Sequence, residues 1–118
     1  KIRLLGSVTD MPRFYRSLDL FILASITEGF PNVLIESYAS KVPCIATDVG
    51  DVKSIISESD YIVKPKDPNA LCDAVLRFLD LKLEEREELI EKNFNLVKSR
   101  YYLPTIVGRY RSEWQSSQ

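Results

Sequence analysis

The chain has 118 residues, of which 45% are hydrophobic and 28% are charged, and its formal net charge is −1. This length predicts one domain with its own hydrophobic core, and the composition excludes a disordered or fibrous protein. The near-zero net charge provides no general attraction to nucleic acid, so we expect no nucleic-acid partner. No apolar run approaches the roughly 20 residues of a membrane-spanning helix.

The residues available for acid–base and metal chemistry are few. Histidine is absent, which leaves carboxylates, lysine, tyrosine and cysteine. The two cysteines, Cys44 and Cys72, fit neither a redox pair nor a zinc site, so we interpret both as reduced core thiols of a cytosolic protein. The sequence contains no Asp-x-Asp pair to hold a divalent cation, and we expect no metal site.

Strand and helix signals alternate along the first half of the chain. Residues 2–6 predict a short strand, and Asp10 followed by Pro12 predicts the start of a helix. Residues 20–24 ("LFILA") form a continuous apolar run, which is typical of a parallel strand covered on both faces, and we place it at the centre of the sheet. Pro31 then starts a second helix. Its expected buried side consists of Leu34, Ile35, Tyr38 and Ala39.

The same alternation continues to residue 81 and then gives way to helices. Residues 43–48 predict a strand, residues 52–57 a short helical turn and residues 61–64 a further strand. Asp67 and Pro68 open a helix. We expect its inward face to consist of Leu71, Val75, Phe78 and Leu79.

The last part of the chain predicts two helices. Residues 82–101 are charge-dense, and we expect a surface helix that packs along one stripe and exposes its charges. The stripe contains Leu89, Ile90, Phe94 and Val97. Residues 104–117 predict a closing helix whose stripe of Ile106, Val107, Tyr110 and Trp114 could dock on another domain.

Four strand signals alternating with helices predict an α/β fold. The order of elements favours a Rossmann-like, doubly wound parallel sheet with right-handed crossovers. We expect one domain over residues 1–118, with residues 82–118 as a helical tail.

The loop after the second predicted strand is the candidate ligand site, because open α/β sheets bind ligands beyond the carboxyl ends of their strands. Gly29 would allow a ligand to approach the backbone, and Pro31 defines the start of the next helix. The first amides of that helix, those of Asn32, Val33 and Leu34, carry the positive end of the helix dipole and could bind a phosphate.

Two acids flank this helix start. Glu28 comes from the loop, whereas Glu36 shares a helix face with Asn32, four residues earlier. Carboxylates accept hydrogen bonds from sugar hydroxyls. A ligand with its diphosphate at the helix amides and one sugar at each acid would be a nucleotide sugar. Similar spacing also occurs where both acids are ordinary solvated charges, and spacing alone does not separate these readings.

The stretch from Ser25 to Ala39, S-x-x-E-G-F-P-N-V-L-I-E-S-x-A, followed by "VPCIATDVG", resembles the family 4 glycosyltransferases of the GT-B fold. The resemblance runs from residues 4–6 to residues 63–71. It implies that the chain is the second half of the C-terminal, donor-binding domain of such an enzyme. The implied reaction is a retaining, metal-independent transfer from a nucleoside-diphosphate sugar, which is a substrate, so no cofactor is expected.

The resemblance also assigns roles to residues. Glu28 matches the acid near the donor sugar and is the expected catalytic residue, and Glu36 matches the acid that holds the ribose. The expected donor-binding residues are Glu28, Gly29, Phe30, Pro31, Asn32, Val33, Leu34 and Glu36. Ser7 and Val8 would lie near the base.

Four positions depart from the family pattern. Lys41 replaces a glycine that usually ends the helix, and Tyr38 replaces a methionine. Asp51 stands where a second glycine is usual, and Ser54 stands where an acid is common. The loop around these last two positions is therefore expected to differ in shape from that of the family.

The resemblance implies partners that this chain does not contain. These are an N-terminal GT-B domain and an acceptor, either a sugar or a lipid-linked glycan, in polysaccharide or glycoconjugate synthesis. We expect a cytoplasmic enzyme that associates with the membrane through its N-terminal domain, and a fragment that is inactive alone. The alternative is a non-catalytic Rossmann-like binding module. Glycoside hydrolysis is disfavoured, because one acid lies on a loop and the other beside a phosphate site.

Overall fold

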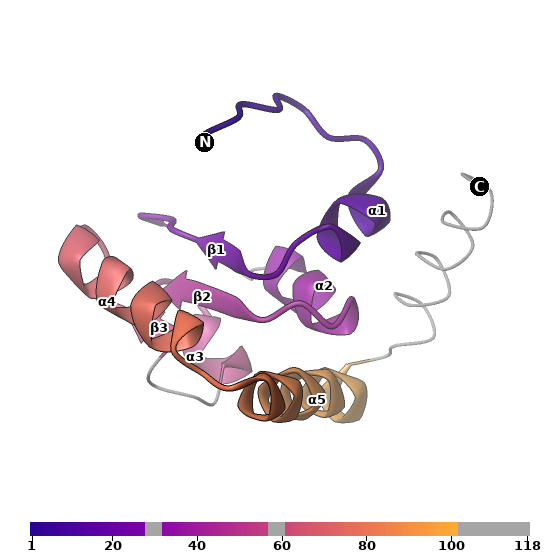
Figure 1. Cartoon of the computed structure of the whole chain (residues 1–118). Helices are drawn as coiled ribbons and strands as arrows, with labels where there is room; N and C mark the ends of the chain where they lie inside the picture. The colour runs from indigo at the N-terminus through magenta and orange to yellow at the C-terminus, as the bar shows by residue number, and fades with distance from the viewer. Residues whose placement is uncertain (28–31, 57–60, 102–118) are drawn as a thin grey trace.

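A parallel sheet of three strands forms the centre of the part of the chain that is described (Figure 1). The structure is a computed structural model that describes residues 1–27, 32–56 and 61–101. The strands are β1 (Phe21–Leu23), β2 (Cys44–Thr47) and β3 (Ile62–Val63). They lie in the order β1-β2-β3, and both pairings are parallel. The predicted α/β fold with a parallel sheet is confirmed.

Five helices connect and cover the strands of the described residues. They are α1 (Met11–Arg16), α2 (Asn32–Ala39), α3 (Val52–Ile55), α4 (Pro68–Leu79) and α5 (Leu83–Arg100). The Asp10 side chain accepts a hydrogen bond from the Arg13 amide at the start of α1, and Asp67 does the same for the Ala70 amide of α4. These two predicted helix starts are therefore confirmed, since the acids cap amides that lack helical partners.

The central strand of the described sheet is β2, so our placement of residues 20–24 at the centre is wrong. All four residues of β2 are buried, whereas β1 pairs with β2 on one side only. Ile22 on β1 is 42% exposed, although the Ile45 opposite it in the register is fully buried. An apolar run indicates that a strand favours burial, but the neighbouring elements decide whether it is covered.

The two faces of β2 pack into two separate hydrophobic clusters. Cys44 and Ala46 lie in the cluster formed with α2, α3 and α5, which also contains Leu34, Ile35, Tyr38, Val52, Ile55, Ile56 and Val97. Ile45 points the other way and packs with Val63, Ala74 and Phe78 under α4. Because successive side chains of a strand alternate between faces, helices on both sides are needed to bury β2.

Residues 2–6 form no strand, which corrects the first predicted element. Ile2 and Leu4 are each 93% exposed and Leu5 is 58% exposed. This segment arches away from the sheet before α1 (Figure 1). A short apolar run becomes a strand only where a neighbouring strand can pair with its backbone, and the segment does not run beside β1.

The helix predictions that fall on the described residues are confirmed except for single positions. Phe78 is buried and Leu71 and Val75 are partly buried, but Leu79 is 54% exposed and Ala74 takes the inward position. In α5, Val97 is fully buried and the other three stripe residues are partly buried.

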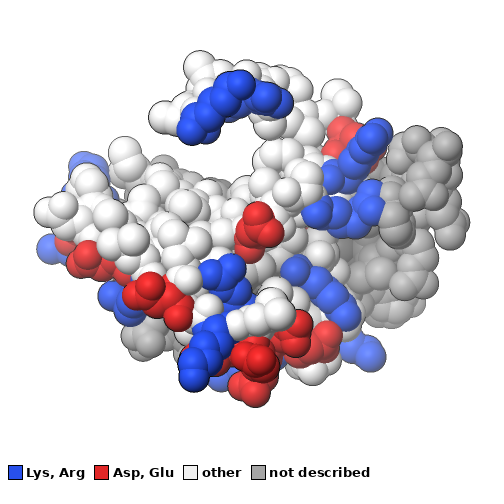
Figure 2. All heavy atoms as spheres, in the orientation of Figure 1, with Lys and Arg blue, Asp and Glu red and all other residues white. Residues whose placement is uncertain are grey.

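Acidic and basic side chains are intermixed over the lower surface, where α5 lies (Figure 2). The closing helix predicted at 104–117, with Trp114, lies outside the described residues.

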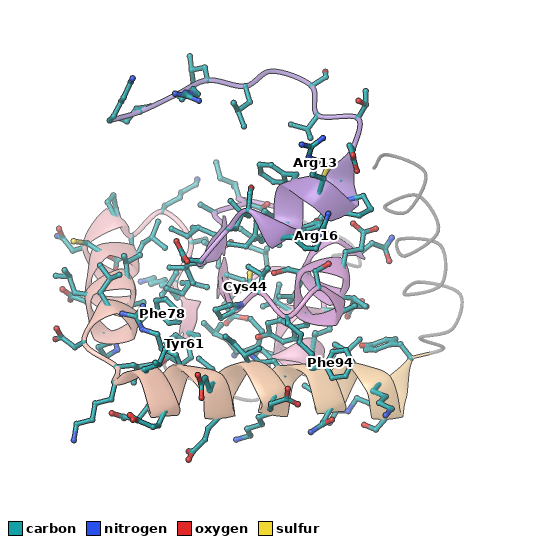
Figure 3. All side chains as sticks on the ribbon, turned by 45° about the vertical axis from the view of Figure 1, so that its right-hand side comes forward. Arg13, Arg16, Cys44, Tyr61, Phe78 and Phe94 are labelled. Atoms are coloured by element: carbon teal, nitrogen blue, oxygen red, sulfur yellow. The ribbon has the colours of Figure 1, made fainter. Side chains whose placement is uncertain are left out.

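The two cysteines differ in their environment. Both are free thiols, but Cys44 is buried in β2 (Figure 3) whereas Cys72 is exposed on α4, so the prediction of two core thiols is wrong for Cys72. Burial raises the pKa of the Cys44 thiol, which therefore stays protonated at neutral pH.

Lys41, just after the last residue of α2, has a left-handed backbone conformation that favours glycine. Its φ is 61°, its amide donates to the Tyr38 carbonyl, and the Val42 amide donates to the Ser37 carbonyl. This pair of bonds is the Schellman motif, in which glycine normally occupies the left-handed position. Lys41 Nζ also lies 3.0 Å from Glu91 Oε1 and 4.9 Å from the centre of the Phe94 ring, so the side chain joins α2 to α5.

We expect Lys41→Gly to be more stable than Lys41→Ala by about 1 kcal/mol, because a Cβ atom is strained at this φ. Both variants lose the contacts with Glu91 and Phe94, so their difference isolates the backbone term. Denaturant unfolding of the two variants measures it. The same pair of changes at Lys92, inside α5, should give the opposite order, since alanine favours a helix interior. Equal stabilities at position 41 would contradict the prediction.

Candidate functional site

The candidate site lies where the parallel strands end. Leu23, Thr47 and Val63 are the last residues of β1, β2 and β3, and parallel pairing brings these ends to one edge. The segment after β1 leads to α2, whose first residue is Asn32. Because α2 begins soon after the carboxyl end of β1, its start lies at the edge where α/β sheets bind ligands. The first amides of a helix have no carbonyl partner within it, so they are available to a ligand there.

Thr47 ties the end of β2 to the segment that follows β1. Its hydroxyl lies 2.6 Å from the Ser25 carbonyl oxygen and 3.3 Å from the Leu23 carbonyl oxygen. The side chain is almost fully buried, so these backbone oxygens satisfy a hydroxyl group that would otherwise be costly to bury. The chain is thereby held in place as it leaves β1 toward the candidate site.

Glu36 lies in the second turn of α2 and contacts α1. The Tyr15 hydroxyl lies 3.3 Å from Glu36 Oε2 and also 3.3 Å from the Val33 carbonyl oxygen. Tyr15 is fully buried, whereas Glu36 is only partly buried. A partly exposed carboxylate that is oriented from the protein side can accept hydrogen bonds from a ligand on its open side.

The other predicted donor-binding residues are placed only in part. Asn32 is exposed, Val33 is partly buried and the Leu34 side chain is fully buried, so Leu34 could meet a ligand through its backbone alone. The first four of the set, Glu28, Gly29, Phe30 and Pro31, lie outside the described residues. That Glu28 and Glu36 open onto one crevice therefore stays a prediction.

The loop that departs from the family pattern is held by contacts within the loop and by one contact from α5. The Ser54 hydroxyl donates to the Asp51 carbonyl oxygen at 2.6 Å, and Arg100 of α5 donates to the Ser54 carbonyl oxygen. Lys53 Nζ lies 3.0 Å from Asp48 Oδ2; the Lys53 side chain is exposed and Asp48 is half-buried. Ser54 thus serves the end of a helical turn, which is an ordinary role for a short hydroxyl side chain.

Two residues of this region were not predicted from the sequence as part of the site. Tyr15 falls in the helix predicted to start at Asp10, and Thr47 in the strand predicted over residues 43–48. The available signal was chemical: a buried tyrosine or threonine hydroxyl needs a hydrogen-bond partner. Which partner it finds could not be predicted, because Tyr15 and Glu36 are 21 positions apart.

Within the part of the chain that the structure describes, no helix is long and apolar enough to cross a bilayer. The same residues contain no group of three or more histidine, cysteine, aspartate or glutamate side chains that could hold a metal ion.

Comparison with known proteins identifies the family. The family model of the group 1 glycosyl transferases matches residues 1–81, well over half of the chain. The chain belongs to the group 1 glycosyltransferases. The matched residues include β1, α2, β2 and β3, and therefore all three strand ends. They also include Tyr15, Glu36 and Thr47.

Two curated relatives are glycosyltransferases by name. Over 84 residues the chain is 36% identical to the lipopolysaccharide core biosynthesis mannosyltransferase LpsB of Rhizobium meliloti, covering 68% of this chain and 24% of that protein. Over 105 residues it is 27% identical to an Escherichia coli enzyme, covering 83% of this chain and 27% of that protein. The enzyme's name is UDP-Gal:alpha-D-GlcNAc-diphosphoundecaprenol alpha-1,3-galactosyltransferase.

A third relative matches nearly the whole chain. It is the N-acetyl-alpha-D-glucosaminyl L-malate synthase of Bacillus anthracis, which is 29% identical over 115 residues, covering 95% of this chain and 30% of that protein. The chain therefore spans about a quarter to a third of the length of these three relatives.

Proposed function

We propose that this chain is the second half of a donor-binding domain, within a longer enzyme that transfers a sugar from a nucleoside diphosphate to an acceptor with retention. The observation that carries the proposal is the family match over residues 1–81, which includes the acid-bearing segment from Ser25 to Ala39. The sheet supports it, because its strand ends and the start of α2 meet at the edge where such domains bind nucleotides.

Each part of the donor would meet a different group. The diphosphate would lie at the first amides of α2, where the helix dipole favours a negative charge. Glu36 would accept hydrogen bonds from the ribose hydroxyls, since it is partly exposed and its carboxylate is contacted by Tyr15. Glu28 would act on the donor sugar, as the family resemblance implies.

The relatives support polysaccharide or glycoconjugate synthesis as the setting. By their names one is a lipopolysaccharide core mannosyltransferase, one is a galactosyltransferase acting on a diphosphoundecaprenol-linked sugar, and one is a glucosaminyl malate synthase. Three different sugars and acceptors appear in these names. The acceptor class we propose is a sugar or lipid-linked glycan, recognised by an N-terminal domain of the longer protein.

The test compares the full-length protein with the 118-residue chain. We expect the full-length protein to release a nucleoside diphosphate from one of a panel of UDP- and GDP-sugars, in the presence of EDTA, and to form a product whose anomeric configuration by NMR matches the donor. We expect the 118-residue chain to bind no donor at micromolar concentration in calorimetry. The dipole of α2 contributes only about 0.3–1 kcal/mol per favourable contact. This contribution is opposed by the repulsion between the diphosphate and the nearby carboxylates.

Several outcomes would contradict this proposal. Micromolar donor binding by the 118-residue chain would show that the rest of the protein is not needed for donor binding. Loss of activity in EDTA would show a metal requirement. A full-length protein that binds donors but transfers none would favour the alternative, a non-catalytic binding module of the same fold.

A further inference from the structure

Tyr15 is held rigidly between aromatic neighbours. Its side chain is fully buried on α1. The ring lies 5.9 Å from that of Phe14 and 5.6 Å from that of Phe21, which it meets edge-on. Aromatic contacts of this kind leave a side chain with two χ angles little freedom. The position of its hydroxyl is therefore set by α1 and β1.

This hydroxyl reaches two acceptors on α2. Val33 carbonyl oxygen and Glu36 Oε2 both lie 3.3 Å away, so one hydroxyl proton is shared between the helix backbone and the carboxylate. The charged carboxylate is the stronger acceptor. Because a carboxylate has about four acceptor positions, the contact with Tyr15 leaves others for a ligand.

We propose that Tyr15 is a positioning residue, which holds the Glu36 carboxylate in the orientation that accepts hydrogen bonds from two neighbouring hydroxyls of the ribose. The inference rests on the proposed function and extends it by naming the group that orients the acid. A glutamate side chain loses considerable rotational freedom when it binds a ligand. A contact that orients it beforehand reduces this cost and strengthens binding.

The test measures binding of UDP and GDP to the full-length protein by calorimetry, each beside its 2′-deoxy analogue. We expect Tyr15→Phe to raise the dissociation constant of the bound nucleotide about three- to tenfold, the effect of one lost hydrogen bond. The preference for the ribose nucleotide over its 2′-deoxy analogue should shrink in this variant. The turnover number at saturating donor should stay close to that of the unmodified protein, since Tyr15 acts through Glu36 and not on the reacting atoms.

A second variant shows whether Tyr15 acts through Glu36. We expect Glu36→Gln to weaken nucleotide binding about tenfold. In a Glu36→Ala background, which removes the side-chain acceptor of the Tyr15 hydroxyl, Tyr15→Phe should add little, because two residues of one contact are not additive. An equal effect of Tyr15→Phe in both backgrounds would overturn the inference, since the hydroxyl would then act on the Val33 carbonyl or on the fold.

A control and two further outcomes separate the remaining possibilities. Tyr38→Phe removes a hydroxyl from another buried tyrosine, and we expect it to leave nucleotide binding unchanged even where it lowers the melting temperature. If Glu36→Gln weakens binding and Tyr15→Phe does not, Tyr15 has no positioning role and the proposed function stands. If Glu36→Gln changes nothing, the ribose role of Glu36 fails, and the inference fails with it.

Discussion

Glu36→Ala in the full-length protein is expected to raise the dissociation constant for the nucleotide-sugar donor about 10- to 100-fold. A hydrogen bond to a charged group contributes about 1.5–3 kcal/mol, and each 1.4 kcal/mol corresponds to a factor of ten in affinity. The alanine variant removes the carboxylate and with it one of the hydrogen-bond acceptors of the Tyr15 hydroxyl. Calorimetry with the donor identified by the panel, together with initial rates, measures the change.

Glu28→Ala should give a different kinetic pattern. By the family resemblance, Glu28 acts on the sugar that reacts, so its loss should lower the turnover number more than it lowers donor affinity. Glu36→Ala should instead act mainly on donor binding, and its turnover number at saturating donor should change less. Equal changes of both parameters in the two variants would contradict the division of roles between ribose and donor sugar.

Phe78→Ala is expected to lower the free energy of unfolding by about 3–5 kcal/mol, because the change leaves a void in the core. Phe78 is 2% exposed and packs with Ile45 and Val63 of the sheet beneath α4. The Arg86 guanidinium lies 4.9 Å from its ring and donates to the Leu79 carbonyl oxygen at 2.8 Å, so α5 also closes over this position. A loss of this size is a large fraction of the stability of a typical domain.

The neighbouring residue provides the control for this prediction. Leu79 is 54% exposed, and we expect Leu79→Ala to cost less than about 1 kcal/mol. Urea unfolding of the 118-residue chain compares the two variants. If Phe78→Ala does not fold, Phe78→Leu keeps most of the volume and should show a smaller loss in the same direction. Equal losses at positions 78 and 79 would show that α4 packs with a different face inward.

The start of each capped helix and the type of most elements were determined by the sequence alone. Asp10 and Asp67 were predicted to open α1 and α4, and both side chains accept the expected amide hydrogen bonds. Such signals are local, because a cap acts within three residues and a helical stripe repeats within a turn or two. The same is true of the motif from Ser25 to Ala39, whose residue types and spacing were enough to indicate the family.

Burial and long-range contacts were decided only by the tertiary structure. The apolar run at residues 20–24 predicted a central strand, but β1 is at the edge of the described sheet and exposes Ile22, because α4 covers β2 and β3. The run at residues 2–6 forms no strand and pairs with none of the strands that the described residues contain.

The orientation of the candidate site also depends on the tertiary structure. Glu36 was predicted as a ligand-binding acid, but its contact with Tyr15 crosses 21 positions of sequence, and the contact of Lys41 with Glu91 crosses 50. Neither pair could be predicted from spacing, since each depends on how two helices pack against one another. Residue chemistry thus indicated which groups could bind a ligand, and packing determined how Glu36 is held.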